Sequence, residues 1–197
     1  WLRFEYADQQ RWGGFTPYAV EWDFSSKNGK PLYLTLSDGS EASLIGRIDR
    51  IDSDGEHAFI TDYKSGSAPS SKAMAQGLDL QLPVYLLAVA ALSKQQLAVS
   101  GGCYYSLKEG KRKSAFLLES VGNSDLPYKK PKNAEALTWD SFKHEKEQLL
   151  KDYIERIYAG DFALAGCKRC DVYCPLHDIC RIQLVSGANE QGGESDE

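Results

Sequence analysis

The sequence has little that would mark a membrane or secreted protein. It contains no apolar run approaching the roughly 20 residues that a membrane-spanning helix needs. Its first residues, WLRFEYADQQRW, hold no apolar segment of the kind that forms the centre of a secretory signal peptide. We therefore expect a cytoplasmic protein. The chain begins with Trp1 rather than Met, so we also expect a fragment of a longer polypeptide.

The sequence also lacks an excess of positive charge. Its net charge is −5, which argues against a protein that coats nucleic acid through bulk charge, although basic residues can still cluster locally. There is no internal repeat. At 197 residues, of which 42% are hydrophobic and 26% charged, the chain is long enough for one sizeable domain with its own core.

One stretch, from Ala42 to Tyr85, organises the rest of the chain. It predicts a strand, a turn, a strand, a loop and a helix. The turn spans 52–56, where Asp and Gly favour a tight reversal. The second strand, His57–Tyr63, is apolar, β-branched and aromatic, and it runs into Lys64. The first strand is expected to carry Ile45, Ile48 and Ile51, with Asp49 and Asp52 among them.

Other elements follow from periodicity and turn signals. Alternation predicts strands over 16–24 and 31–36, which the dipeptide Asn28-Gly29 would join as a hairpin. Helical spacing of apolar residues predicts one helix over 72–92, which places Gln81 and Tyr85 on one helix face. Further predictions are strands over 103–107 and 114–120 joined by a hairpin, and a helix from Thr138 or Asp140 to about Tyr158.

Two acidic side chains and a lysine would meet where neighbouring strands end. These are Asp49, Asp62 and Lys64. Buried charges are costly unless they pair or bind something, and Mg²⁺ or Mn²⁺ takes one or two carboxylates together with water and phosphate oxygens. A lysine beside such a cation can orient a water molecule or stabilise developing charge. An isolated Asp-x-Lys, by contrast, most often arises by chance and leaves a solvated lysine.

Three ordered motifs carry a specific resemblance. They are Gly46-Arg47-Ile48-Asp49-Arg50-Ile51-Asp52, then Asp62-Tyr63-Lys64-Ser65-Gly66, then Gln81-Leu82-Pro83-Val84-Tyr85. In this order the motifs resemble those of the RecB-type PD-(D/E)XK nucleases, most of all the C-terminal nuclease domain of AddB-type helicase–nuclease subunits. The resemblance covers about 17–181.

The resemblance implies a restriction-endonuclease-like α/β fold, a mixed central sheet flanked by helices. It implies that Asp49, Asp62 and the Tyr63 main-chain carbonyl bind Mg²⁺ or Mn²⁺ and that Lys64 is the catalytic lysine. Gln81 and Tyr85 match a Gln-x-x-x-Tyr helix that shapes the site and holds DNA. We thus expect a nuclease domain over 1–185, with a cysteine-bearing segment over 160–181, and an acidic disordered tail over 186–197.

One departure from the family pattern concerns histidine. RecB-type nucleases often have a metal-binding histidine on a helix before the first strand, but no histidine precedes His57 here. Either the chain starts after that position or the protein lacks the ligand. Glu21 could substitute for it, or could simply be a surface glutamate on a strand.

Four of the five cysteines lie close together near the C-terminus: Cys167, Cys170, Cys174 and Cys180. Clustered thiols without a signal peptide indicate a reducing compartment and an iron–sulfur cluster or zinc. The resemblance implies a [4Fe–4S] cluster, although the family's usual trio is Cys-x2-Cys-x5-Cys with one cysteine far upstream. Four local ligands could complete a cluster, or one is spare; zinc remains the alternative. Cys103 is expected to be a buried core residue.

Two short basic patches are open to two interpretations, solvated loops or contacts with a phosphate backbone. They consist of Lys108, Lys111, Arg112 and Lys113, and of Lys129, Lys130 and Lys132.

Together, these features predict a Mg²⁺- or Mn²⁺-dependent deoxyribonuclease. The resemblance implies an exonuclease on single-stranded DNA that acts beside a helicase domain or subunit in recombination and double-strand break repair. The alternative is a non-catalytic DNA-binding module stabilised by a cysteine-bound metal.

Overall fold

The computed structural model describes residues 14–27, 30–117 and 138–161, with side chains for all of these except 114–117. The described residues fall into two compact units, one that ends at Glu155 and one that begins at Arg156. The cysteine quartet, the second basic patch and the expected acidic tail lie outside the described residues. None of the described helices is both long and apolar enough to cross a membrane.

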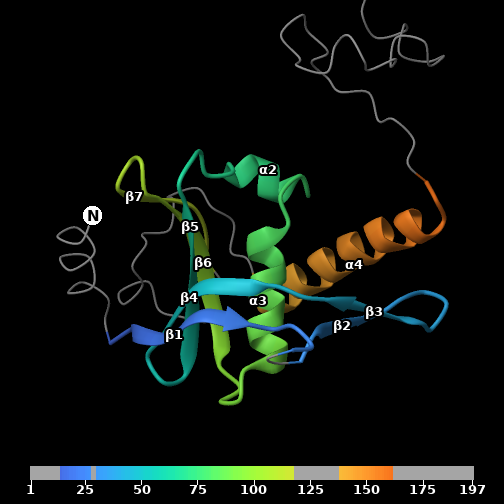
Figure 1. Ribbon diagram of the computed structural model, residues 1–197, viewed down its shortest axis with the longest axis horizontal. Helices are drawn as coiled ribbons and strands as arrows, with labels where there is room; N and C mark the ends of the chain where they lie inside the picture. The colour runs from blue at the N-terminus through green and yellow to red at the C-terminus, as the bar shows by residue number, and fades with distance from the viewer. Residues whose placement is uncertain (1–13, 28–29, 118–137, 162–197) are drawn as a thin grey trace, which may run out of the picture. The chain divides into compact units, whose positions relative to one another are not determined.

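A five-stranded mixed sheet forms the centre of the larger unit, in the order β1-β4-β5-β6-β7 (Figure 1). Only β5 and β6 pair in parallel among these five strands, while the other neighbours are antiparallel. This arrangement, with helices packed against the sheet, confirms the expected mixed α/β fold. The strands are β1 (Thr16–Asp23), β4 (Arg47–Ser53), β5 (His57–Lys64), β6 (Ala98–Ser106) and β7 (Lys111–Leu117).

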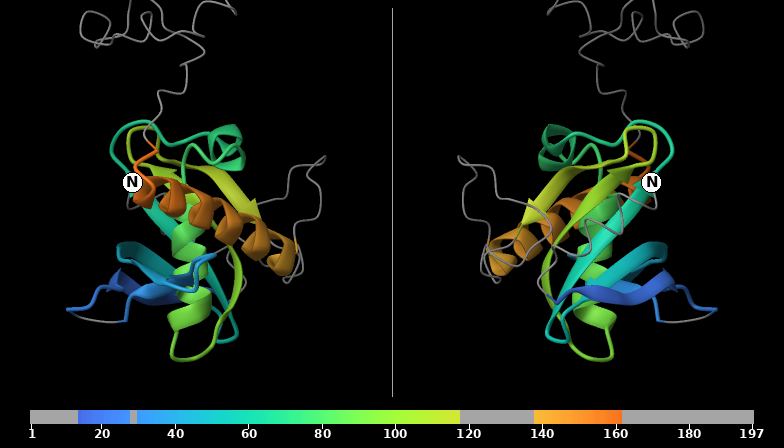
Figure 2. Two further views of the ribbon diagram at one scale, coloured as in Figure 1. Left: turned by 90° about the vertical axis from the view of Figure 1, so that its right-hand side faces the viewer. Right: turned by 90° about the vertical axis from the view of Figure 1, so that its left-hand side faces the viewer.

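Three helices accompany the sheet: α2 (Ser71–Ala75), α3 (Gln81–Leu92) and α4 (Trp139–Tyr158). Helix α3 lies in the crossover that a parallel β5–β6 pair requires, and it packs on β5, β6 and β2. It is apolar almost all round because most of its length is buried in the core. Helix α4 is amphipathic and adds Phe142 and Leu150 to that core. Figure 2 shows α3 and α4 against the sheet.

The helix predicted over 72–92 is two helices rather than one. Gly77, between them, has φ +71°, a conformation that other residues rarely adopt. A Cβ at this position would lie 2.6 Å from Leu149 Cδ2 on α4, and the Tyr153 hydroxyl donates to the Gly77 carbonyl at 3.4 Å. Helix α4 therefore packs on the break itself. Leu78, expected on the buried stripe, is 76% exposed.

The predicted hairpin at Asn28-Gly29 is also wrong, because its two strands belong to different sheets. Strand β1 pairs with β4, while β2 (Leu32–Thr35) pairs with β3 (Glu41–Leu44) in a separate two-stranded sheet. The chain leaves the central sheet after Phe24, whose buried ring packs edge-on against Tyr85 at 6.1 Å. The strand expected to contain Ile45 is likewise broken at Ile45–Gly46, and Ile45 is 65% exposed.

Asp52 was expected in a turn but lies in β4, fully buried. It stands opposite Phe59 of β5, and its Oδ1 accepts from Arg50 Nε at 2.9 Å and Nη2 at 2.8 Å. A buried carboxylate needs such a partner, because desolvation of an unpaired charge is costly. Arg50 also donates to the Tyr63 hydroxyl at 3.2 Å.

Cys103 is fully buried, which confirms the prediction of a core residue. Arg112, however, does not belong to a solvated basic tip. It is 8% exposed and donates to Thr61 Oγ1 at 3.3 Å and to Cys103 Sγ at 3.6 Å. Its neighbours in the first basic patch, Lys111 and Lys113, both pair with Glu109.

We predict that Gly102→Ala lowers the free energy of unfolding by about 1–3 kcal/mol, as overpacking of a core does. A Cβ on Gly102 would lie 2.9 Å from the Ile60 carbonyl oxygen and 3.0 Å from Leu82 Cδ1, so either β5 or α3 would have to shift. Urea denaturation of the purified chain measures this loss. Gly66→Ala is the matched control, since a Cβ there meets nothing within 4 Å, and equal stability of both variants would contradict the prediction.

Candidate active site

The end of β5 places two opposite charges under the first turn of α3. Asp62 and Lys64 are two residues apart in one strand, so their side chains share a face of the sheet. Lys64 Nζ lies 2.8 Å from Asp62 Oδ2. The Asp62 side chain is 3% exposed and that of Lys64 is 24% exposed, so the ion pair is shielded but can be reached from solvent.

Asp49 comes to the same place from the adjacent strand. Strands β4 and β5 pair with Arg50 opposite Thr61, which puts Asp49 beside Asp62 one residue further on. The Tyr63 main-chain N–H donates to Asp49 Oδ2 at 2.8 Å, and this bond fixes the carboxylate at the end of β5. The structure therefore brings together Asp49, Asp62 and Lys64, the three charged residues that the sequence pattern predicts as the site.

Gln81, the first residue of α3, connects the charged groups. Its Nε2 donates to Asp62 Oδ1 at 2.9 Å and to the Tyr85 hydroxyl at 2.9 Å, while its Oε1 accepts from Lys64 Nζ. All hydrogen-bonding atoms of the Gln81 amide thus have a partner. Tyr85 lies one helical turn away on the same face, as the sequence spacing predicts.

Burial is the main influence on the charge of Asp62. Desolvation raises the pKa of its carboxyl above the usual value of 3.8, and the nearby carboxylates of Asp49 and Asp79 raise it further, against the opposing effect of Lys64. Burial likewise raises the pKa of the Tyr85 phenol, so this group stays protonated at neutral pH. The site therefore carries more negative charge than Lys64 alone neutralises.

These residues fit a hard divalent cation. Asp62 Oδ2 is buried and makes no hydrogen bond within the described residues beyond its ion pair with Lys64, and Asp49 offers a second carboxylate beside it. Oxygen donors of this kind suit Mg²⁺ or Mn²⁺, which take one or two carboxylates and complete their shell with water and phosphate. In the described part of the chain, no cluster of three or more His, Cys, Asp or Glu side chains could hold a metal by itself.

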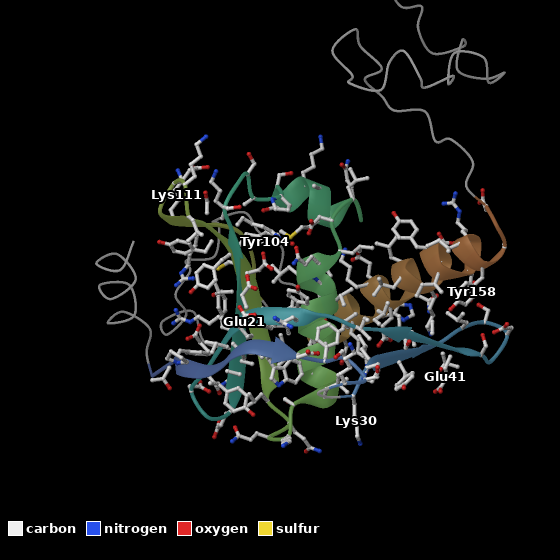
Figure 3. All side chains as sticks on the ribbon, in the orientation of Figure 1. Glu21, Lys30, Glu41, Tyr104, Lys111 and Tyr158 are labelled. Atoms are coloured by element: carbon white, nitrogen blue, oxygen red, sulfur yellow. The ribbon has the colours of Figure 1, made fainter. Side chains whose placement is uncertain are left out.

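Two residues at the site were missed in the sequence. Tyr104 of β6 stands opposite Asp62 in the parallel ladder, and its ring lies beneath Lys64 Nζ, 5.1 Å from ring centroid to nitrogen. Its hydroxyl donates to Asp79 Oδ1 just before α3 (Figure 3). In the sequence, Tyr104 is indistinguishable from the other aromatic residues of a buried strand, and Asp79 belongs to a segment that predicts a continuous helix.

Glu21, the possible substitute for the family's histidine, is a surface residue. Its side chain is 65% exposed and pairs with the equally exposed Arg47, 3.3 Å from Oε2 to Nη1. Exposed pairs of this kind contribute little to stability. The position of Glu21 thus agrees with the interpretation of a glutamate on a strand surface.

The comparison with known proteins bears directly on this site. The family model of the PD-(D/E)XK nuclease superfamily matches residues 1–181. The chain belongs to this superfamily. Its three motif regions therefore lie within the matched range, and so does the cysteine quartet outside the described residues.

Similar proteins bear out the resemblance to one subgroup of the superfamily. The chain is 41% identical over 97 residues to the AddB protein of the ATP-dependent helicase/deoxyribonuclease of Clostridioides difficile, which is 46% of this chain and 8% of that protein. The protein of the same name from Desulforamulus reducens is 41% identical over 95 residues, and that from Alkaliphilus metalliredigens 35% over 108 residues. These matches cover 45% and 50% of this chain, and 8% and 9% of those proteins. The chain therefore spans less than a tenth of the length of these relatives.

We predict that Asp62→Asn makes the metal-free protein more stable at neutral pH. The folded pKa of Asp62 is raised, so the wild-type carboxyl favours folding below pH 3.8 and loses this contribution as pH rises through the folded pKa. The advantage of the variant should therefore emerge as pH rises from below 3.8 towards neutrality. Urea denaturation across this range in EDTA measures it.

The matched control is Asp38→Asn. Asp38 is exposed, and hydrogen bonds from Ser40 lower the pKa of its carboxyl, so this variant should gain no stability as pH rises. A loss of stability in Asp62→Asn at neutral pH relative to the wild type would contradict the argument from burial.

Proposed function

We propose that this chain is the nuclease domain of a helicase–nuclease and that it hydrolyses phosphodiester bonds in DNA with Mg²⁺ or Mn²⁺. The observation that carries the proposal is the contact of Lys64 with Asp62 beneath Gln81, with Asp49 held beside them. In a superfamily defined by two acidic residues and a lysine, this arrangement is the one that catalysis needs. A domain that served only to hold DNA would have no use for an ion pair with these buried carboxylates.

Asp49 and Asp62 would hold the cation, together with the main-chain carbonyl of Tyr63. When bound, the cation would lower the pKa of a water molecule and screen negative charge on the scissile phosphate. The chain's part is to keep both carboxylates ionised and fixed. The Tyr63 N–H bond to Asp49 and the Gln81 amide bond to Asp62 do so before any cation binds.

Lys64 would act on the reacting groups. Its ammonium is partly exposed and can move from Asp62 towards a phosphate oxygen or an attacking water molecule. There it would orient that water and stabilise the charge that develops on the phosphate in the transition state. Gln81 and Tyr85 would keep Lys64 and Asp62 in place and contact the DNA backbone.

The names of the relatives suggest the setting of this reaction. Each is the AddB protein of an ATP-dependent helicase/deoxyribonuclease. We therefore propose a helicase domain or subunit as the partner, single-stranded DNA as the substrate and exonucleolytic cleavage as the reaction, in recombination and double-strand break repair.

We also propose that Cys167, Cys170, Cys174 and Cys180 bind a [4Fe–4S] cluster, with zinc as the alternative. Elemental analysis of anaerobically purified protein should give about four iron atoms per chain and broad visible absorbance. Cys174→Ser should lower both, whereas Cys103→Ser, which changes a buried thiol outside the quartet, should not. About one zinc per chain without visible absorbance would favour the alternative.

We predict that Asp62→Ala and Lys64→Ala each lower Mg²⁺-dependent degradation of end-labelled single-stranded DNA by at least about 100-fold, the usual cost of one group that stabilises transition-state charge. The two variants should differ in metal affinity. Asp62→Ala should weaken Mn²⁺ binding, measured by electron paramagnetic resonance, whereas Lys64→Ala should leave it near the wild-type value.

Glu21→Gln is the matched control and should retain wild-type activity, because Glu21 lies on the exposed surface. A wild-type protein that binds DNA but does not degrade it with Mg²⁺ or Mn²⁺ would be a non-catalytic DNA-binding module. Reduced activity of Glu21→Gln would instead make this residue the missing ligand.

A further inference from the structure

We propose that Tyr104, held by Asp79, is a positioning residue that fixes Lys64 and the first turn of α3 relative to each other. The proposal rests on the proposed nuclease function. Neither residue belongs to the three motifs that identify the site in the sequence, and neither touches the reacting groups in the mechanism above.

The first contact is between the Tyr104 ring and the Lys64 ammonium. Tyr104 is fully buried, and its ring centroid lies 5.1 Å from Lys64 Nζ. An ammonium over an aromatic face is attracted by the electron density of the ring, and the attraction is stronger where water is excluded. The ring thus supports the lysine from below, while Asp62 and Gln81 hold it from the sides.

The second contact is between the Tyr104 hydroxyl and the start of α3. A helix begins with main-chain N–H groups that have no partner in the helix, and a side chain at the N-cap usually accepts from one of them. The N-cap residue of α3, Leu80, supplies no such bond. Instead, Tyr104 comes from another strand and accepts from the Leu82 N–H at 3.3 Å.

Asp79 determines the direction of that hydroxyl. The Tyr104 O–H donates to Asp79 Oδ1, so a lone pair of the same oxygen is left to face Leu82. Burial and this hydrogen bond raise the pKa of the Tyr104 phenol, which therefore remains a donor at any pH at which the protein works. Asp79 is on the chain segment that leads into α3, so the bond also ties that segment to the sheet.

A single side chain therefore links the two elements that build the site. Lys64 is on β5 and Gln81 is the first residue of α3, next to the capped Leu82. If the hydroxyl is removed, the first turn of α3 loses its cap and Gln81 is freer to move away from Lys64 and Asp62. Displacement of a reacting group by about 1 Å can cost about 100-fold in rate.

The test is steady-state kinetics of Tyr104→Phe, Asp79→Asn and the double variant, made in the full chain with its helicase partner. Tyr104→Phe keeps the ring and should lower kcat by about 10- to 100-fold, with KM for single-stranded DNA changed by no more than about twofold. Asp79→Asn should lower kcat less. The double variant should match Tyr104→Phe, because Asp79 acts only through the hydroxyl.

Tyr105→Phe is the matched control. This neighbour in β6 is equally buried, but its ring packs against Tyr63 and Arg112 on the opposite face of the sheet. It loses the same atom from the same strand and should keep the wild-type kcat. A wild-type kcat in Tyr104→Phe would overturn the proposal, and so would an equal loss in Tyr105→Phe, which would indicate a general effect on the sheet.

Hydrogen exchange separates this proposal from the proposed nuclease function. Loss of the cap should speed exchange of the Leu82 amide about tenfold in Tyr104→Phe and leave it unchanged in Tyr105→Phe. This readout needs neither metal nor activity. An inactive wild type would refute the nuclease function while the exchange data still tested the cap. An active wild type with unaltered exchange and kcat in Tyr104→Phe would refute the positioning role alone.

Discussion

The site depends on a carboxylate that the fold buries beside a lysine. Asp62 is 2% exposed, and without a partner its charge would be too costly to keep in the core. Lys64 and the Gln81 amide make burial tolerable, yet burial still raises the pKa of the carboxyl, so the neutralisation is incomplete. An excess of negative charge in a shielded place is what attracts a cation. In this protein, therefore, the feature that makes the local structure expensive is also the one that makes it useful.

Strand β5 can carry such a site because its two faces have separate partners. Asp62 and Lys64 point towards α3, while Thr61 and Tyr63 point to the other face, where Arg50 and Arg112 donate to their hydroxyls. The second face thus holds buried charges of its own, with Asp52 paired to Arg50. Polar residues on both sides of one central strand would weaken most sheets. Here each has a hydrogen-bond or ion-pair partner, so the strand stays in place and the end that bears Lys64 is held rigidly.

How far the sequence predicts this architecture depends on how local each feature is. The Asp62-x-Lys64 pair and the Gln81–Tyr85 spacing are set within one strand and one helix, and both were predictable. Asp52 was misread because Asp favours turns, and nothing nearby in the sequence shows that Arg50 neutralises it in a strand. The break at Gly77 depends on α4, more than 60 residues later, which packs against the glycine. The role of Tyr104 was hidden for the same reason, since its partners lie in α3 and β5.

The start of α3 shows why tertiary contacts, rather than local signals, complete such a site. A helix that carried its own cap at Leu80 would form its first turn independently of the sheet. Because the cap comes from β6, the first turn forms only when β5, β6 and α3 are already packed, and Gln81 then takes its place over Asp62 and Lys64 together with the rest of the core. The geometry of the charged groups is therefore a product of complete folding. A partly folded chain would leave Asp62 and Lys64 accessible to solvent, where their interaction is weak and a cation has little reason to bind.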